Sequence, residues 1–226
     1  MKPWVHLGVA PIPGDAGELR LMRRDAEFSI RLGHTELMNS RLRGSEEALA
    51  TLAFARAPGA QAGRVLIGGL GMGFTLRAAL AALSPRAHVD VVELVPAVVA
   101  WARGPMEPLF GDSLSDPRVQ IHEADVAAVI GQARLAYDAI LMDVDNGPEG
   151  LTRSANDGLY DVAGLGAAMA ALRPGGVLAV WSSAPDAGFT QRLRRVGFAV
   201  TEERPRANGK TGRGARHVIW LAVSPA

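Results

Sequence analysis

The stretch Arg64–Arg77, RVLIGGLGMGFTLR, decides the fold that we expect for this chain. Its apolar beginning, Val65–Ile67, is typical of a buried parallel strand. Glycines then occupy alternate positions: Gly69, Gly71 and Gly73. Glycine lets the backbone turn tightly and approach a ligand that any Cβ would push away. The alanine-rich residues 74–83 predict a helix with unpaired N–H groups at its start, so the pattern favours a nucleotide-binding loop, although such turns also occur without a ligand.

A carboxylate ends the next predicted strand. Residues 89–92 are apolar, and Glu93 follows them twenty residues after Gly73. At the end of the second strand of a doubly wound sheet, a carboxylate lies across the crevice from the glycine loop and can accept hydrogen bonds from both ribose hydroxyls. The alternative is a solvated acid at the start of a helix. The spacing favours the ribose-binding interpretation of Glu93.

Two further strand ends carry acids. Asp125 follows the strand predicted at 119–122 and is a candidate partner for an adenine amino group, but it is equally suited to cap a helix over 126–133. Asp143, Asp145 and Asn146 follow the strand predicted at 139–142. Because ligands bind at the carboxyl edge of a parallel sheet, we expect all of these side chains to face one crevice. The alternative for the second group is that they are ordinary turn residues.

Strands and helices alternate through most of the chain, which predicts an α/β fold with a doubly wound, mostly parallel sheet. Further helices are predicted over 96–103, 159–172 and 187–196, a further strand over 177–181, and an antiparallel pair over 199–204 and 217–223. Residues 1–43 differ, because their alternating segments indicate a small β-hairpin or short sheet that would meet the substrate. A helix opening with Ser45 as its N-cap would begin the second region, 44–226.

The order of the motifs resembles the spermidine synthase family of aminopropyltransferases, whose fold is that of class I S-adenosylmethionine-dependent methyltransferases. The resemblance extends from about Gly63 to Val180 and rests on VLIGGLGMGFTLR, VVEL, DPRV, EADV, YDAILMDVDNGP, LY and LRPGGVLAV. It implies that 44–226 form a Rossmann-like domain that binds decarboxylated S-adenosylmethionine, or S-adenosylmethionine, as donor substrate. The glycines, Glu93 and Asp125 would bind this donor. A small-molecule amine would be the acceptor, and dimers are usual among such relatives.

In this resemblance, Asp143 falls on the first aspartate of the family's Asp-rich loop. Transfer of carbon from a sulfonium to an amine requires an uncharged amine, and a carboxylate can hold the ammonium and accept its proton. Asp143 is therefore the candidate catalytic base, and Asp145 would help to hold the amine. The loop is about two residues shorter than the family's, so that either Asp145 or Asn146 takes the place of the second acid.

Two departures from the family pattern bear on the activity. Met72 stands where the family's glycine loop carries an aspartate that faces the donor's amino group. An aspartate there would repel the carboxylate of intact S-adenosylmethionine, so Met72 removes a preference for the decarboxylated donor. The family's Tyr-His-Glu signature is also missing, and only His34, Glu36 and Glu46 stand nearby as substitutes.

Composition indicates one enzyme-sized domain of ordinary polarity, with 226 residues, 48% hydrophobic and 21% charged. A formal net charge of +1 gives no general attraction to nucleic acid or membranes, and the basic segment 204–217 lacks the aromatic residues of a nucleic-acid surface. With no Cys and five scattered His, we expect no metal site. No leader-like start and no long apolar run is present, so we expect a cytoplasmic location.

Three functions fit these observations. The motif order and the Asp-rich loop favour transfer of an aminopropyl group to an amine. The loss of the acid at Met72 favours a methyltransferase that uses intact S-adenosylmethionine. A domain that binds an adenosyl compound without catalysis is the third, but two neighbouring acids, Asp143 and Asp145, are costly to retain without a use.

Overall fold

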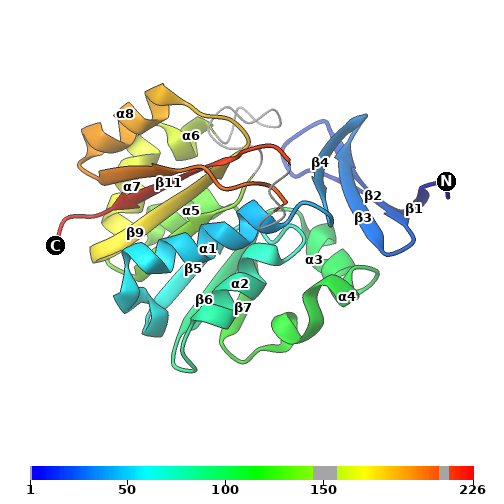
Figure 1. Ribbon diagram of the computed structural model, residues 1–226, viewed down its shortest axis with the longest axis horizontal. Coiled ribbons are helices and arrows are strands. Elements are labelled where there is room, and N and C mark those ends of the chain that lie inside the picture. Colours follow the sequence, from blue (N-terminus) through cyan, green and yellow to red (C-terminus); the bar gives the residue numbers. More distant parts are fainter. Residues whose placement is uncertain (1, 145–156, 209–213) are drawn as a thin grey trace.

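Two sheets organise the chain in the computed structural model, which describes residues 2–144, 157–208 and 214–226 (Figure 1). In these residues the large sheet has seven strands: β5 (Arg64–Gly68), β6 (His88–Glu93), β7 (Val119–Glu123), β8 (Tyr137–Met142), β9 (Leu172–Ser182), β10 (Ala199–Glu203) and β11 (Val218–Val223). The smaller sheet is antiparallel: β1 (Val5–Pro11), β2 (Glu18–Arg24), β3 (Glu27–Leu32) and β4 (Thr35–Asn39).

The large sheet has the order β10-β11-β9-β8-β5-β6-β7. Strands β5 to β9 run parallel, and β11 is antiparallel to both of its neighbours. From β5 the chain proceeds outward through β6 and β7, and then returns to β8 on the other side of β5. Such a reversal of strand order opens a crevice at the carboxyl ends of the strands. The fold is therefore the doubly wound α/β fold that the sequence predicts.

Helices cover both faces of this sheet (Figure 1). The face toward α1 carries three helices: α1 (Gly44–Arg56), α2 (Phe74–Ala82) and α3 (Pro96–Arg103). The other face carries four: α5 (Val126–Gln132), α6 (Asp157–Tyr160), α7 (Val162–Ala171) and α8 (Ala187–Val196). A short α4 (Glu107–Phe110) and the 3-10 turns 58–62 and 111–115 complete the described helices. Because side chains of a strand alternate between faces, Val65 and Ile67 join the first core and Leu66 the second.

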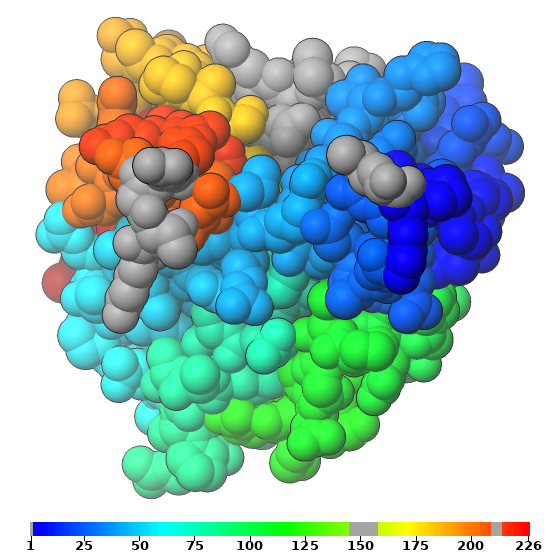
Figure 2. All heavy atoms as spheres, turned by 45° about the vertical axis from the view of Figure 1, so that its right-hand side comes forward, coloured from blue at the N-terminus to red at the C-terminus, as the bar shows by residue number. Residues whose placement is uncertain are grey.

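The N-terminal sheet packs on the same core as α1 and α3. Its inward residues, such as Leu21 and Ile30, are fully buried in the same cluster as Val65 and Val98. Figure 2 shows its blue residues beside the green residues of the α3 and α4 segment on one face of the molecule. The alternating segments ELRLMRR and EFSIRL are β2 and β3, so the expected short sheet is present, enlarged by β1 and β4.

Two local predictions were wrong. Ser45 is not an N-cap, because α1 begins at Gly44 and no side chain caps it; Ser45 lies inside the helix and is fully buried. The helix predicted over 159–172 is interrupted at Asp161, whose backbone is extended and whose carboxylate accepts a bond from the N–H of Gly164. The residue that breaks this helix therefore starts α7 as its N-cap.

The remaining segments agree with the expected order. Strands β10 and β11 form the antiparallel pair, and an isolated β-bridge joins Arg206 to Arg216 in the chain between them, on either side of the undescribed residues 209–213. No helix among the described residues is both long and apolar enough to cross a membrane. Within the same residues, no group of three or more His, Asp or Glu side chains is arranged to hold a metal ion.

Candidate active site

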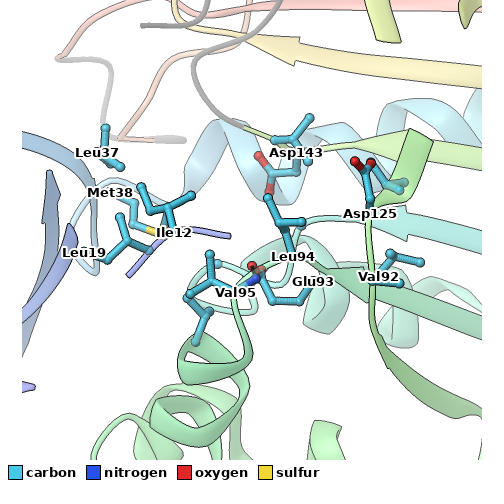
Figure 3. A pocket seen from close by; sticks show the side chains of 16 residues that line it. Ile12, Leu19, Leu37, Met38, Val92, Glu93, Leu94, Val95, Asp125 and Asp143 are labelled. Atoms are coloured by element: carbon cyan, nitrogen blue, oxygen red, sulfur yellow. Dashed lines mark hydrogen bonds between the residues drawn. The ribbon is translucent and has the colours of Figure 1, made fainter. Parts of the chain in front are cut away.

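An open cavity of about 110 Å³ lies where β5, β6, β7 and β8 end (Figure 3). Its polar side chains come from three of these strand ends and are the acids Glu93, Asp125 and Asp143. Gly69 and Gly71 of the glycine loop form part of its wall. The structure thus places five of the predicted site residues around one space. Gly73 lies outside the lining, and Asp145, like Asn146, falls outside the described residues.

The glycine loop depends on glycine at two positions. Gly69 has φ +90°, and a Cβ there would overlap the carbonyl oxygen of Asp143. Gly73 has φ +79° at the N-cap of α2, and a Cβ there would overlap the ring of Phe110. Such backbone angles and such close approaches are open to glycine alone. Glycine at position 69 therefore lets the ends of β5 and β8 approach each other, and glycine at position 73 lets Phe110 pack against the start of α2.

Glu93 holds the glycine loop from the end of β6. Its Oε2 accepts a hydrogen bond from the N–H of Leu70 at 2.9 Å, and its Oε1 accepts one from the N–H of Val95 at 2.9 Å. The side chain is buried, and burial raises its pKa while the N–H groups of Val95, Leu70, Gly71 and Leu94 oppose that rise. The carboxylate already accepts a hydrogen bond from Leu70 of the glycine loop, and its contact with a ribose stays a prediction.

Asp143 stands at the end of β8, facing the cavity. Its N–H donates to the carbonyl of Gly68 at 2.9 Å, which continues the pairing of β8 with β5. Its Oδ2 lies 2.7 Å from the hydroxyl oxygen of Thr75 in the first turn of α2. Burial raises the pKa of Asp143 to about 6, against the bond from Thr75, which lowers it. Asp143 therefore has the protonation behaviour of a base that works near neutral pH.

A second carboxyl group lies close to Asp143. Glu46 belongs to the first turn of α1, and its pKa is raised well above its ordinary value. Burial is the largest cause, and the negative charges of Asp143 and Glu47 add to it. The charge of Asp143 therefore favours a state in which Glu46 carries a proton while Asp143 is ionised. Of the three substitutes considered for the missing family signature, Glu46 is thus the one near Asp143.

The other two substitutes lie away from the cavity. His34 is exposed in the turn between β3 and β4. Glu36 is tied into the N-terminal sheet, where it accepts bonds from Ser29 at 2.7 Å and from Asn39 at 2.9 Å. Neither residue lines the cavity.

Asp125 combines both roles considered for it. Its carboxylate accepts a bond from the N–H of Ala127 at 2.8 Å and so caps α5. It also lines the cavity on the side of β7, opposite the residues of the N-terminal sheet (Figure 3). The capping role is confirmed, and the contact with adenine stays a prediction.

The side chain of Met72 is buried at 2% exposure and belongs to the core, not to the cavity wall. Trp101 and Trp181 are also buried. Trp101 packs against Gly8 of β1, and Trp181 meets the ring of His217 edge-on, with centroids 4.7 Å apart. Both tryptophans are therefore packing residues.

One wall of the cavity is apolar and comes from the N-terminal sheet (Figure 3). It consists of Ile12, Leu19, Leu37 and Met38. The alternation in residues 18–24 identified the strand, and the expected contact of this region with the substrate stays a prediction. The sequence did not reveal the contact of Thr75 with Asp143, because the two residues are 68 positions apart. It likewise missed a hydrogen bond of 2.7 Å between Ser45 Oγ and His217 Nδ1, which ties α1 to the start of β11.

The family follows from a comparison with known proteins. Residues 44–187 match the model of the spermine/spermidine synthase domain. The chain belongs to the spermine/spermidine synthase family. The match begins with α1, contains the glycine loop, Glu93, Asp125 and Asp143, and ends at the start of α8. The four-stranded N-terminal sheet precedes it.

Two curated relatives are polyamine aminopropyltransferases. Polyamine aminopropyltransferase 1 of Streptomyces coelicolor is 33% identical over 146 residues, which are 61% of this chain and 27% of that protein. The polyamine aminopropyltransferase of Prochlorococcus marinus is 35% identical over 129 residues, 57% of this chain and 43% of that protein. The chain thus matches less than half the length of either relative. Spermidine synthase from Thermotoga maritima has the same fold, with a TM-score of 0.74 at 19% identity, over 96% of this chain and 72% of that one.

Proposed function

We propose that this protein transfers an aminopropyl group from decarboxylated S-adenosylmethionine to a small-molecule amine. The proposal rests on the place and the acidity of Asp143. Its carboxyl group faces the cavity beside the glycine loop, and burial raises its pKa to about 6. Membership of the spermine/spermidine synthase family, with relatives named polyamine aminopropyltransferases, supports it.

The reaction needs a base at this place. The acceptor amine enters as an ammonium ion, and its nitrogen attacks only after a proton is lost. Asp143 attracts the ammonium and takes that proton. The amine nitrogen then forms a bond to the propyl carbon next to the sulfonium, the carbon–sulfur bond breaks, and its electron pair leaves with sulfur as a neutral thioether. Holding both reactants in one cavity makes this step effectively unimolecular.

The donor would occupy the strand ends on the other side of the cavity. Glu93 would accept bonds from the ribose hydroxyls with the lone pairs that the loop leaves open, and Asp125 would meet the adenine amino group. Gly69 and Gly71 would let the adenosyl group approach the backbone. We keep Asp145 as a second residue that holds the amine, with Asn146 as its substitute.

The charge of the cavity favours the decarboxylated donor. Among the described residues that line it there are three acids and no Lys, Arg or His. Intact S-adenosylmethionine would bring a carboxylate into this acidic space without a cation to pair it. Met72 does not line the cavity, so the loss of the family's aspartate gives methyl transfer no advantage there. The apolar wall from the N-terminal sheet suits the methylene groups of the aminopropyl chain.

A homodimer in the cytoplasm stays a prediction. The edge strand β1 exposes an apolar stripe, with Val5 at 55%, Leu7 at 38% and Val9 at 52% exposure. An exposed edge that is also apolar is a surface on which a second copy can pair. Sedimentation of the wild type and of Val9→Glu tests this. A wild type that is a monomer at all concentrations rules the dimer out.

Calorimetric titration with decarboxylated and with intact S-adenosylmethionine, followed by mass analysis of putrescine or spermidine after incubation, tests the activity. We expect the decarboxylated donor to bind more tightly and the amine to gain one aminopropyl unit. A gain of one methyl group shows a methyltransferase instead. Binding of either donor without any product over a panel of amines shows a domain that binds without catalysis.

A further inference from the structure

The hydroxyl group of Thr75 lies between two oxygen acceptors from different parts of the chain. Its Oγ1 is 2.7 Å from Oδ2 of Asp143 and 3.2 Å from the backbone carbonyl oxygen of Glu46. Thr75 is 3% exposed, so water has little access to it. The three groups come from α2, from the end of β8 and from the first turn of α1.

Thr75 cannot donate a hydrogen bond to both of these oxygen acceptors at the same time. A threonine hydroxyl has one hydrogen to donate, and both an ionised carboxylate and a carbonyl oxygen can only accept. When Asp143 is ionised, Thr75 therefore donates to one acceptor and leaves the other without a bond from it. The carboxylate is the stronger acceptor, because it is charged. When Asp143 is neutral, that advantage is gone, and Thr75 can accept a bond from the acid while donating to Glu46.

We propose that Thr75 is the positioning residue for Asp143: it holds the ionised carboxylate by donating its only hydroxyl hydrogen, which turns to the Glu46 carbonyl oxygen when Asp143 takes up a proton. This inference deepens the proposed function and rests on it, since the proton is the one that the acceptor ammonium gives up. No heavy atom has to move, because the rotation of one hydroxyl serves both states. After the product leaves, Asp143 returns the proton to water through the open cavity.

The surroundings of Asp143 make such a partner necessary. Among the described residues, the charged side chains around Asp143 are acids: Glu46 lies close to it on α1, and Glu93 and Asp125 line the same cavity. Burial raises the pKa of Asp143, and the bond from Thr75 is what opposes that rise. Without this bond, a larger fraction of Asp143 would be protonated at neutral pH and unable to accept the proton of the amine.

The test is a direct titration of Asp143 that does not depend on turnover. The full chain is labelled with ¹³C at the aspartate carboxyl carbons, and Asp143→Asn identifies the signal of Asp143. In Thr75→Val, which keeps the shape and removes the hydroxyl, we expect the pKa of Asp143 to rise by about one unit or more. Thr75→Ser should return it toward the wild-type value. The pKa of Asp143 is also measured in Thr75→Ala, which replaces Thr75→Val in the test if the valine variant does not fold.

Two further measurements separate this proposal from a structural role. Glu46→Gln changes the side chain and keeps the backbone carbonyl, so it should leave the effect of Thr75→Val on the pKa of Asp143 in place. With activity established, the acid limb of kcat/KM should move to higher pH in Thr75→Val and back in Thr75→Ser. An unshifted carboxyl titration in both Thr75→Val and Thr75→Ala overturns the proposal. A shifted titration in a protein that makes no product with any donor overturns the proposed function alone.

Discussion

Gly69 and Asp143 meet through their backbones at the centre of the cavity edge. The space that a Cβ of Gly69 would need is taken by the carbonyl oxygen of Asp143, whose own N–H donates to Gly68 at 2.9 Å. The glycine that opens the loop and the acid that follows β8 are therefore placed by one contact. A substitution that moves the backbone of either residue should therefore also displace the other.

We expect Gly69→Ala to destabilise the protein by about 2 kcal/mol or more, because alanine is strained at φ +90° and its Cβ would push the Asp143 backbone away. Urea unfolding measures the loss, and turnover should fall with it as Asp143 moves. Gly166→Ala is the matched control, since Gly166 lies inside α7 and a Cβ there would meet nothing within 4 Å. That change should stabilise by up to about 1 kcal/mol. Equal stability of the two variants would contradict the close approach.

Asp143→Asn should abolish turnover and keep donor binding. The amide has nearly the same shape but cannot take a proton from the amine, so we expect a loss of at least about a hundredfold in kcat. Calorimetry with decarboxylated S-adenosylmethionine should give an unchanged affinity. Asp112→Asn, a change at an exposed acid outside the cavity lining, is the control and should leave both quantities unchanged. Normal turnover of Asp143→Asn would remove Asp143 from the mechanism.

The raised pKa of Asp143 also predicts how stability depends on pH. In the unfolded chain an aspartate has a pKa of about 3.9, against about 6 in the fold. The folded state therefore holds the proton more tightly, and the free energy of unfolding falls as pH rises between these values. Below about pH 4 the group is protonated in both states and makes no contribution, and above about pH 6 its full penalty of up to about 3 kcal/mol is present.

Asp143→Asn removes this penalty. Urea unfolding of the wild type and of the variant between pH 4 and pH 8 measures the free energy of unfolding of each. The variant's advantage in this free energy should grow from about pH 4 to about pH 6 and stay constant above that. The raised pKa of Glu46 acts in the same direction, and Asp143→Asn also removes the part of that rise that comes from the charge of Asp143. A constant difference from pH 4 onward would mean that Asp143 titrates normally.

The succession of strands and helices that builds the large sheet was predictable because its signals are local. Val65–Ile67, the glycines and the acids at the strand ends each show in a few consecutive residues, and parallel strands buried on both faces are plainly apolar. The break at Asp161 was missed because alanine and glycine continue the apolar run on its far side, so that periodicity alone indicated one helix. Ser45 has the residue type of a cap, but its hydrogen bond with His217 gives it another use.

The site was predictable only in part, for a physical reason. Glu93, Asp125 and Asp143 follow strands, and the topology of a parallel sheet brings strand ends to one edge. The contact between Thr75 and Asp143 depends on how α2 lies against β8, and the apolar wall with Met38 depends on how the N-terminal sheet docks. Packing between distant elements leaves no periodic signal in a single sequence.

Asp125 has two roles, which a pair of variants can separate. Asp125→Ala should lose about 1 kcal/mol of stability, because the N–H of Ala127 loses its cap, and should also weaken donor binding. Asp161→Ala is the matched control, since Asp161 caps α7 in the same way and does not line the cavity. It should lose a similar amount of stability and bind the donor normally. Donor affinity that falls equally in both variants would mean that Asp125 acts only through the stability of its helix.

Glu93→Gln tests whether the buried carboxylate binds the donor or only the loop. Glutamine keeps the volume, but its NH₂ group would face one of the N–H groups of Leu70 and Val95 that Glu93 now accepts from. We expect donor affinity to fall at least about tenfold, because a ribose loses a charged acceptor. Amide hydrogen exchange at these two residues, measured without donor, reports the loop separately. Faster exchange with unchanged donor affinity would make Glu93 a residue of the loop alone, whereas weaker binding with unchanged exchange would place it against the ribose.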